Sequence, residues 1–378
     1  MEIPLSRAYI SANELKYIEE CLLSRRTSNV GEFASRCQRY FSEKYSFKNS
    51  ILTTSCTDAL EMSAILLNLE RGDEIILPSY SFVSCALPFE MRGLKLVFAD
   101  SSSEHPNINA KRIEELITKR TRAILIIHYA GVACDLDKII DISNRHGLFL
   151  IEDAAHAINS FYKGKPLGSF GDLSTMSFHE SKNISCGEGG LLIVNDKSLF
   201  QRAEIIRDKG TNRTDFVCGK VDKYNWIDIG SSFGQSEILA ALLLSQLESL
   251  ENIQAKRISI WNRYSEILSE LKDKELCELP NVPDYASNNA HIFYLVCKSS
   301  EERNALIGYL KRREIQAAFH YQSLHSSPYF FSKHDGRDLI NADKYSNRLV
   351  RLPIYADLHL KVVDLIADII LDFYKTCR

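Results

Sequence analysis

The sequence of 378 residues has ten cysteines but no C-x-x-C pair and no cysteine spacing typical of a metal site. It contains no apolar run near the roughly 20 residues that a membrane helix needs. Its first residues lack the charged and apolar regions of a signal peptide. We therefore expect reduced thiols, a cytoplasmic protein and no membrane partner.

The chain also lacks an excess of positive charge, since 46 lysines and arginines face 49 aspartates and glutamates. Without a basic arm or a helix-turn-helix pattern, it has no electrostatic basis for binding nucleic acid. Internal repeats and low-complexity segments are absent too. A content of 45% hydrophobic and 25% charged residues is typical of an ordinary globular chain with a large core.

Short apolar runs alternate with helical patterns over the first two thirds of the chain, which predicts an α/β fold with a mostly parallel sheet. Helical patterns at 110–117 and 136–145 separate some of the runs, and one long helix from 236 toward 264 ends this part. A strand at 292–296 and a helix at 302–312 indicate a smaller α/β domain. We expect a large domain at 1–250 and a small one at 251–378. The predicted strands of the large domain are 74–77, 95–99, 123–128, 148–152, 173–178 and 191–194.

A lysine and an aspartate stand just after two of these strands. Asp153 follows the apolar run 148–152, and Lys182 follows the strand at 173–178. Parallel strands end at the edge of the sheet where α/β proteins bind ligands. Pyridoxal phosphate (PLP) needs a lysine for its aldehyde and an acid for its pyridine nitrogen. Alone, either residue is more often a surface or turn residue, and the pair together predicts a PLP site.

Small polar residues before a predicted helix supply a candidate phosphate site. Ser55, Cys56 and Thr57 precede the apolar positions of that helix. Hydroxyls and free amides at a helix N-terminus bind phosphate, and the same hydroxyls serve equally well as plain caps. The segment alone leaves both interpretations open, and the lysine–aspartate pair favours phosphate.

Two further residues have both a functional and a purely structural interpretation. Phe82 follows the strand at 74–77, where it can stack on a pyridine ring or pack in the core. His156 lies three residues after Asp153, where it can donate to the phenolic oxygen of PLP or be an ordinary loop histidine. Although His179-Glu180 is nearby, no H-E-x-x-H spacing exists, so we expect no metal.

Four motifs together resemble the DegT/DnrJ/EryC1/StrS sugar aminotransferases, which are PLP enzymes of fold type I. The motifs are SCTDAL at 55–60, PSYSFV at 78–83, EDAAH at 152–156 and SFHESKN at 177–183. The resemblance covers nearly the whole chain. It implies transfer of an amino group from L-glutamate to a nucleotide-linked keto sugar, in a homodimer whose subunits share active sites.

The resemblance also implies a role for each site residue. Lys182 is the catalytic lysine that binds the PLP aldehyde, and Asp153 pairs with the pyridine nitrogen. In related sugar dehydratases a histidine replaces the lysine, so Lys182 favours transamination. The other cofactor contacts implied are Ser55, Cys56, Thr57, Phe82, His156, Ser177 and, across the dimer, Ser232.

A narrower resemblance links 209–213, 221–226 and 228–233 to one branch of the family, which makes dTDP-4-amino-4,6-dideoxygalactose for enterobacterial common antigen. It implies dTDP-4-keto-6-deoxyglucose as the amino acceptor. Three residues depart from the wider family: Cys56 replaces a glycine, His156 a glutamine and Ser232 an asparagine. The His-for-Gln change preserves the capacity to hydrogen-bond.

The segment 319–325 resembles a part of the family near the substrate, which assigns substrate binding to His320, Tyr321 and His325. A polar strand end and turn explains the same residues. Three alternatives for the whole protein also stay open: a sugar aminotransferase of gluco stereochemistry, another fold type I reaction such as an amino-acid lyase, and a PLP-binding regulator without turnover.

Overall fold

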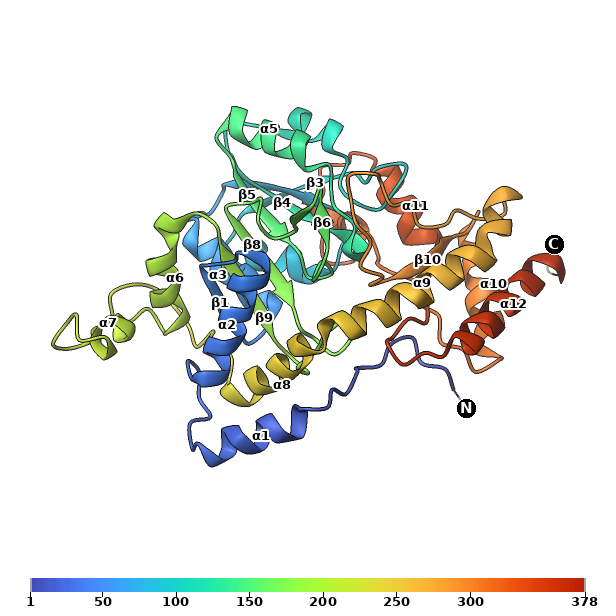
Figure 1. Ribbon diagram of the computed structural model, residues 1–378. Helices are drawn as coiled ribbons and strands as arrows, with labels where there is room; N and C mark the ends of the chain where they lie inside the picture. Colours follow the sequence, from blue (N-terminus) through green and yellow to red (C-terminus); the bar gives the residue numbers. More distant parts are fainter. Residues whose placement is uncertain (1, 377–378) are drawn as a thin grey trace.

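The computed structural model describes residues 2–376, and a seven-stranded sheet forms its centre (Figure 1). The strands lie in the order β1-β9-β8-β5-β4-β2-β3, and those from β8 to β3 run parallel. β9 is antiparallel to both of its neighbours. The seven strands are β1 Ser50–Thr53, β2 Glu74–Pro78, β3 Lys95–Ala99, β4 Thr121–Ile127, β5 Phe149–Asp153, β8 Leu173–Ser177 and β9 Gly190–Val194.

Helices cover both faces of this sheet, which explains why its strands are buried at nearly every position rather than at alternate ones. In β2, Ile76 belongs to the core under one face, whereas Ile75 and Leu77 belong to the core under the other. One layer contains α1 Glu14–Leu23, α2 Glu32–Tyr45, α5 Leu136–His146 and α8 Glu237–Glu248. The other contains α3 Cys56–Leu66, α4 Leu87–Met91 and α6 Phe200–Arg207.

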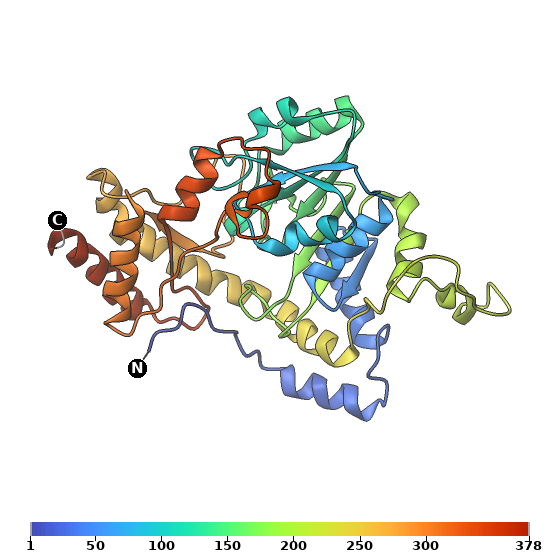
Figure 2. The same cartoon turned by 180° about the vertical axis from the view of Figure 1, so that it is seen from behind.

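The C-terminal part has a separate core, built on a two-stranded antiparallel sheet. The first residues of the chain join it, because the backbone of Ile3 pairs with that of Glu314 and Gln316. Figure 2 shows both chain ends on this side of the molecule. The division at 250/251 stays a prediction. The elements here are α9 Leu250–Asp273, β10 Phe293–Val296, α10 Ser300–Lys311, α11 Ile340–Arg348, β11 Leu349–Leu352 and α12 Leu360–Thr376.

The predicted α/β class and all six predicted strands of the large sheet are confirmed, with ends shifted by one or two residues. The helix predicted at 110–117 is wrong, since the chain forms two short 3₁₀ turns there, Ala110–Arg112 and Glu114–Leu116. Its apolar residues recur every third position, at Ala110, Ile113 and Leu116. That spacing suits three residues per turn rather than 3.6.

The single long helix predicted from 236 toward 264 is also wrong. Ser249 interrupts it, with φ −94° and ψ −1°, and separates α8 from α9. The two helices nevertheless follow one another across the molecule and connect the large sheet to the C-terminal part (Figure 1). No helix of residues 2–376 is both long and apolar enough to cross a membrane.

A buried carboxylate fixes the loop between β5 and β8. Glu152, one residue before Asp153, is fully buried. Burial by itself raises the pKa of Glu152, but hydrogen bonds from His128 and from loop amides outweigh it and hold the pKa below its ordinary value. The groups that lie within 2.6–3.0 Å of its carboxylate are the amides of Gly168, Phe170 and Gly171, Ser174 Oγ and His128 Nε2.

We predict that Glu152→Gln lowers the free energy of unfolding by roughly 2–4 kcal/mol at neutral pH, because an amide NH₂ cannot accept these hydrogen bonds. The lowered pKa means that this carboxylate stabilises the fold above the ordinary carboxyl pKa and loses the effect as pH falls through the lowered pKa. Urea unfolding at neutral and acidic pH measures the difference, which should shrink in acid. The exposed Glu43→Gln is the matched control. Equal unfolding curves for both variants at neutral pH would contradict this role.

Candidate active site

A cavity of about 420 Å³ opens at the carboxyl ends of β4, β5 and β8. Ten of the twelve site residues predicted from the sequence line it, although they come from segments spread over 267 positions from 55 to 321. The carboxyl-end placement is the one expected for an α/β sheet. The ten residues are Ser55, Cys56, Thr57, Phe82, Asp153, His156, Ser177, Lys182, His320 and Tyr321.

One wall of the cavity is the N-terminus of α3. Ser55 caps the helix, because its side chain accepts a hydrogen bond from the amide of Asp58 at 3.0 Å. The amides of Cys56 and Thr57 have no such partner within residues 2–376 and point out of the first turn. The capping interpretation is confirmed for Ser55, and the two remaining amides are available for an anion, so the phosphate site stays a prediction.

The start of β9 approaches this helix end closely. A Cβ atom at Gly190 would lie 2.4 Å from the backbone of Ser55. Thr57 Oγ1 donates to Ser84 Oγ at 3.0 Å, so a second hydroxyl borders the same wall. Gly190 is thus needed for the close packing of β9 against the start of α3.

Lys182 lines the same cavity, in the turn that follows β8. The turn is held by a hydrogen bond from the Lys182 amide to the carbonyl of His179 at 2.9 Å. Burial lowers the pKa of the Lys182 ammonium to about 8, with the field of Arg351 adding to the effect, while Cys56 and Asp153 oppose it. About a tenth of this amine is therefore uncharged at pH 7, far more than for a lysine of ordinary pKa, and the uncharged form is the nucleophile.

Asp153 ends β5 at the floor of the cavity and is 7% exposed. Burial raises the pKa of its carboxyl above the ordinary value, while the amide of Ala155 and the charge of Lys182 act in the opposite direction. Oδ1 accepts from that amide at 3.0 Å, and no hydrogen bond within residues 2–376 reaches Oδ2. A buried acid with one free oxygen fits a protonated ring nitrogen such as that of PLP.

The backbone around His156 determines which of its nitrogens carries the proton. The amide of Ala130 donates to Nδ1 at 3.2 Å, with Ala130 in the left-handed region at φ +57°. An amide can only donate, so Nδ1 must be unprotonated and the proton lies on Nε2. Burial also lowers the pKa of His156 well below its ordinary value. His156 is thus a neutral N–H donor, as the side-chain amide of glutamine would be.

The C-terminal part contributes His320 and Tyr321 to the cavity. Tyr129 Oη and His320 Nδ1 are 2.9 Å apart, and the ring of Tyr321 lies 5.8 Å from that of Phe82. Phe82 is 56% exposed, so one face of its ring is open to a ligand. Tyr129 was not among the predicted residues. Its position just after the predicted strand at 123–128 is the signal that could have found it.

Two predicted site residues lie elsewhere. His325 is buried outside the cavity, with Nδ1 2.7 Å from Ser79 Oγ and Nε2 3.5 Å from a carboxylate oxygen of Asp343. Ser232 is exposed, and its backbone bridges Asp208 away from the cavity of its own chain. The role predicted for Ser232 involves a second subunit, so it stays a prediction, as does substrate binding by His325.

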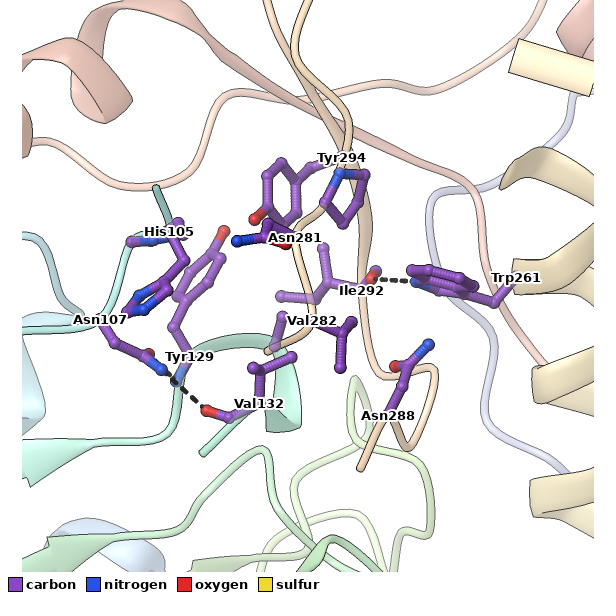
Figure 3. A pocket seen from close by; sticks show the side chains of 13 residues that line it. His105, Asn107, Tyr129, Val132, Trp261, Asn281, Val282, Asn288, Ile292 and Tyr294 are labelled. Atoms are coloured by element: carbon purple, nitrogen blue, oxygen red, sulfur yellow. Dashed lines mark hydrogen bonds between the residues drawn. The ribbon is translucent and has the colours of Figure 1, made fainter. Parts of the chain in front are cut away.

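A second cavity lies behind Tyr129, between the large sheet and the C-terminal part (Figure 3). In Figure 3, His105 and Asn107 face Asn281 and Tyr294 across it. Its volume of about 10 Å³ admits no more than a water molecule. Of these two cavities, the one lined by Lys182 and Asp153 has room for a cofactor and substrate. Within residues 2–376, no three histidine, cysteine, aspartate or glutamate side chains are grouped to hold a metal ion.

The cavity residues therefore fit PLP in three separate respects. Two unpaired amides at the N-terminus of α3 suit its phosphate. Asp153 suits its pyridine nitrogen, and the partly uncharged Lys182 suits its aldehyde.

Comparison with known proteins gives the same picture. The DegT/DnrJ/EryC1/StrS aminotransferase family matches residues 8–371. GDP-perosamine synthase of Escherichia coli O157:H7 is 29% identical over 377 residues, which cover 99% of each chain.

Solved structures extend the comparison to the fold. The Helicobacter pylori aminotransferase PseC, involved in the biosynthesis of pseudoaminic acid, is 26% identical over the full length of both chains, with a TM-score of 0.91. A putative sugar aminotransferase of Streptococcus pneumoniae, Spr1654 in its PLP form, is 22% identical over 99% of each chain, with a TM-score of 0.90. These matches confirm the predicted fold type I. The chain belongs to the DegT/DnrJ/EryC1/StrS aminotransferase family and is a PLP-dependent aminotransferase.

Proposed function

We propose that this aminotransferase transfers the amino group of L-glutamate to a nucleotide-linked 4-keto-6-deoxy sugar. The observation that carries the proposal is the enclosed Lys182 beside Asp153, at the end of the sheet and in one cavity with free helix amides. A lysine at this place gives transamination, whereas related sugar dehydratases have a histidine there. When bound, PLP supplies an electron sink for removal of the donor's α-proton.

The protein's own groups orient the reactants and move the proton. Asp153 would hold the protonated pyridine nitrogen of PLP, and His156 would donate from Nε2 to its phenolic oxygen. Lys182 would hold the PLP aldehyde, and its free amine would be the base that moves the proton from the donor's α-carbon. The same groups work in reverse when the keto sugar replaces the keto acid. Ser177 and the α3 amides hold the phosphate meanwhile.

A specific acceptor follows from the segment 209–233. Its resemblance to the branch that makes dTDP-4-amino-4,6-dideoxygalactose favours dTDP-4-keto-6-deoxyglucose as acceptor, an axial amine at C4, and a role in enterobacterial common antigen. The relative named GDP-perosamine synthase favours a second candidate, a GDP-linked sugar. The two proposals share the aminotransferase reaction and differ in the nucleotide.

We also propose a homodimer that works in the cytoplasm. The segment around α7, Arg213–Val217, projects from the body of the molecule in both views (Figures 1 and 2). Apolar side chains are exposed along it, among them Trp226, which is 83% exposed. Exposed apolar groups of this kind are typical of a subunit interface. Free thiols at nine described cysteines are compatible with a reducing compartment.

We predict that the enzyme, given PLP and L-glutamate, converts dTDP-4-keto-6-deoxyglucose to the 4-amino-4,6-dideoxygalactose product, with the GDP-linked 4-keto-6-deoxy sugar as the competing substrate. Mass spectrometry measures turnover, and proton NMR of the product determines the configuration at C4. Lys182→Ala is the control without turnover. An equatorial amine would indicate gluco stereochemistry, and preference for the GDP sugar would support the second candidate. Failure with every keto sugar nucleotide would contradict the proposed substrate class.

We predict that two inactive variants restore activity when they are mixed. Lys182→Ala lacks the amine, and Ser232→Glu places a negative charge where the neighbouring phosphate is expected to lie. Random exchange of subunits should restore about a quarter of wild-type activity, because half of the dimers are mixed and each has one complete site. Sedimentation of each variant checks that it is a dimer. Dimers that exchange subunits without any recovered activity would contradict a shared site, as would a fully active wild-type monomer.

A further inference from the structure

Asn183, the residue directly after Lys182, is hydrogen-bonded to the C-terminal part of the chain. Its side chain is buried, and Nδ2 donates to the carbonyl of Asn289 at 2.9 Å. Its Oδ1 lies 2.8 Å from Nδ1 of His291, which is equally buried. Because Oδ1 can only accept, Nδ1 of His291 carries the proton and donates it. The turn that carries Lys182 is thus anchored by a side chain 108 positions away from Asn183.

The ring of His291 also contacts His156 in the active-site cavity. The two ring centroids are 4.3 Å apart, and the ring planes meet at 39°. The amide of Ala130 holds Nδ1 of His156 at one edge, and the ring of His291 limits how far the plane can tilt. Together the two contacts fix the direction in which Nε2 of His156 donates. Burial holds the pKa of His291 well below its ordinary value, so the neutral ring adds no positive charge beside Lys182.

A strained turn holds His291 in this position. Ala290, the residue before it, is fully buried with φ +52°, in the left-handed region that residues with a Cβ rarely adopt. Oδ1 of Asn289 accepts from the amide of His291 at 3.1 Å. Arg257 on α9 donates to the carbonyls of Ala290 and His291 at 3.2 and 2.9 Å. Strained backbone that is maintained by the surrounding contacts is common at functional sites.

The same segment, 289–291, is joined to the loop after β5. Asn289 is fully buried, and its Nδ2 donates to two carbonyls of that loop, those of His156 and Ile158, at 2.6 and 2.9 Å. The segment therefore contacts both the loop of His156 and the turn of Lys182. Any displacement of the segment moves the two together.

We propose that His291 is a positioning residue for amino transfer. Through Asn183 it fixes the turn that carries Lys182, and through its ring it holds His156 with Nε2 toward the cofactor. The inference rests on the proposed roles of Lys182 and His156. His291 itself does not line the cavity. It acts on the rate because a small misplacement of reacting groups slows a reaction strongly even when its cause lies away from the chemistry.

Three single variants and one double variant separate positioning from general stability. His291→Phe keeps a flat ring and removes the donor, whereas His291→Asn keeps a donor near the place of Nδ1 and removes the ring. Asn183→Leu removes the acceptor at similar volume, and the double variant combines it with His291→Phe. The control is His105→Phe, which alters another buried histidine that lines the small second cavity and not the active site.

Three measurements are made on each variant. Circular dichroism shows whether it is folded. Stopped-flow absorbance of the PLP-loaded enzyme gives the maximal rate with L-glutamate and the glutamate concentration at half of that rate. Acetylation of the cofactor-free enzyme over a range of pH, read by mass spectrometry, gives the titration midpoint of Lys182 without cofactor or substrate.

We expect His291→Phe and Asn183→Leu each to lower the maximal rate about 30-fold, with a smaller change in half-saturation, because reacting groups are displaced while the binding of glutamate is retained. Both should move the Lys182 midpoint from about 8 toward 10.5, since a loosened turn exposes the amine to water. The double variant should be no slower than the slower single variant, because both substitutions remove one and the same contact.

His291→Asn should keep the midpoint of wild type and still lose rate, because His156 loses its ring contact. His105→Phe should behave as wild type. Should His291→Phe fail to fold, Asn183→Leu tests the same contact.

A folded His291→Phe with the rate and midpoint of wild type would overturn the proposal. A double variant whose two losses multiply would overturn it too, because His291 would then not act through Asn183. A wild type inert toward L-glutamate would contradict the proposed function, and the midpoints of Lys182 would still decide the role of His291.

Discussion

The chemistry of the site depends on one constraint: the enclosed amine of Lys182 must remain partly uncharged. An ammonium withdrawn from water costs free energy, and burial is the main reason why the pKa of Lys182 falls to about 8. Asp153 limits that fall, and Arg351 adds to it. The nucleophile is thus poised by its surroundings rather than by a single contact. Single substitutions of Asp153 or Arg351 should shift the pKa of Lys182 while the protein stays folded.

Two adjacent residues of β5 divide the work between stability and chemistry. Glu152 accepts hydrogen bonds from the amides of Gly168 and Gly171 and so fixes the loop that leads to β8. Asp153, on the opposite face because side chains alternate along a strand, ends in the cavity. The loop that Glu152 fixes leads to β8, and β8 leads directly to Lys182. Strand β5 therefore holds Asp153 and also helps to position Lys182.

Much of this could be predicted from the sequence because it depends on short-range patterns. Apolar strands buried on both faces predicted the parallel sheet, and their carboxyl ends located Asp153 and Lys182. The parts that could not be predicted depend on contacts between distant segments. Ala130 sets the tautomer of His156 from 26 positions away, and Arg351, on β11, contributes to the lowered pKa of Lys182. The break at Ser249 was missed because apolar residues continue on both sides of it.

The most direct test of the enclosed lysine is the protonation of Lys182 in the cofactor-free enzyme. Brief acetylation over a range of pH, followed by mass spectrometry of the peptide that contains Lys182, gives the midpoint of its titration. The structure predicts a midpoint at about 8. A midpoint near the ordinary lysine value of 10.5 would show that the amine is solvated and would contradict the account.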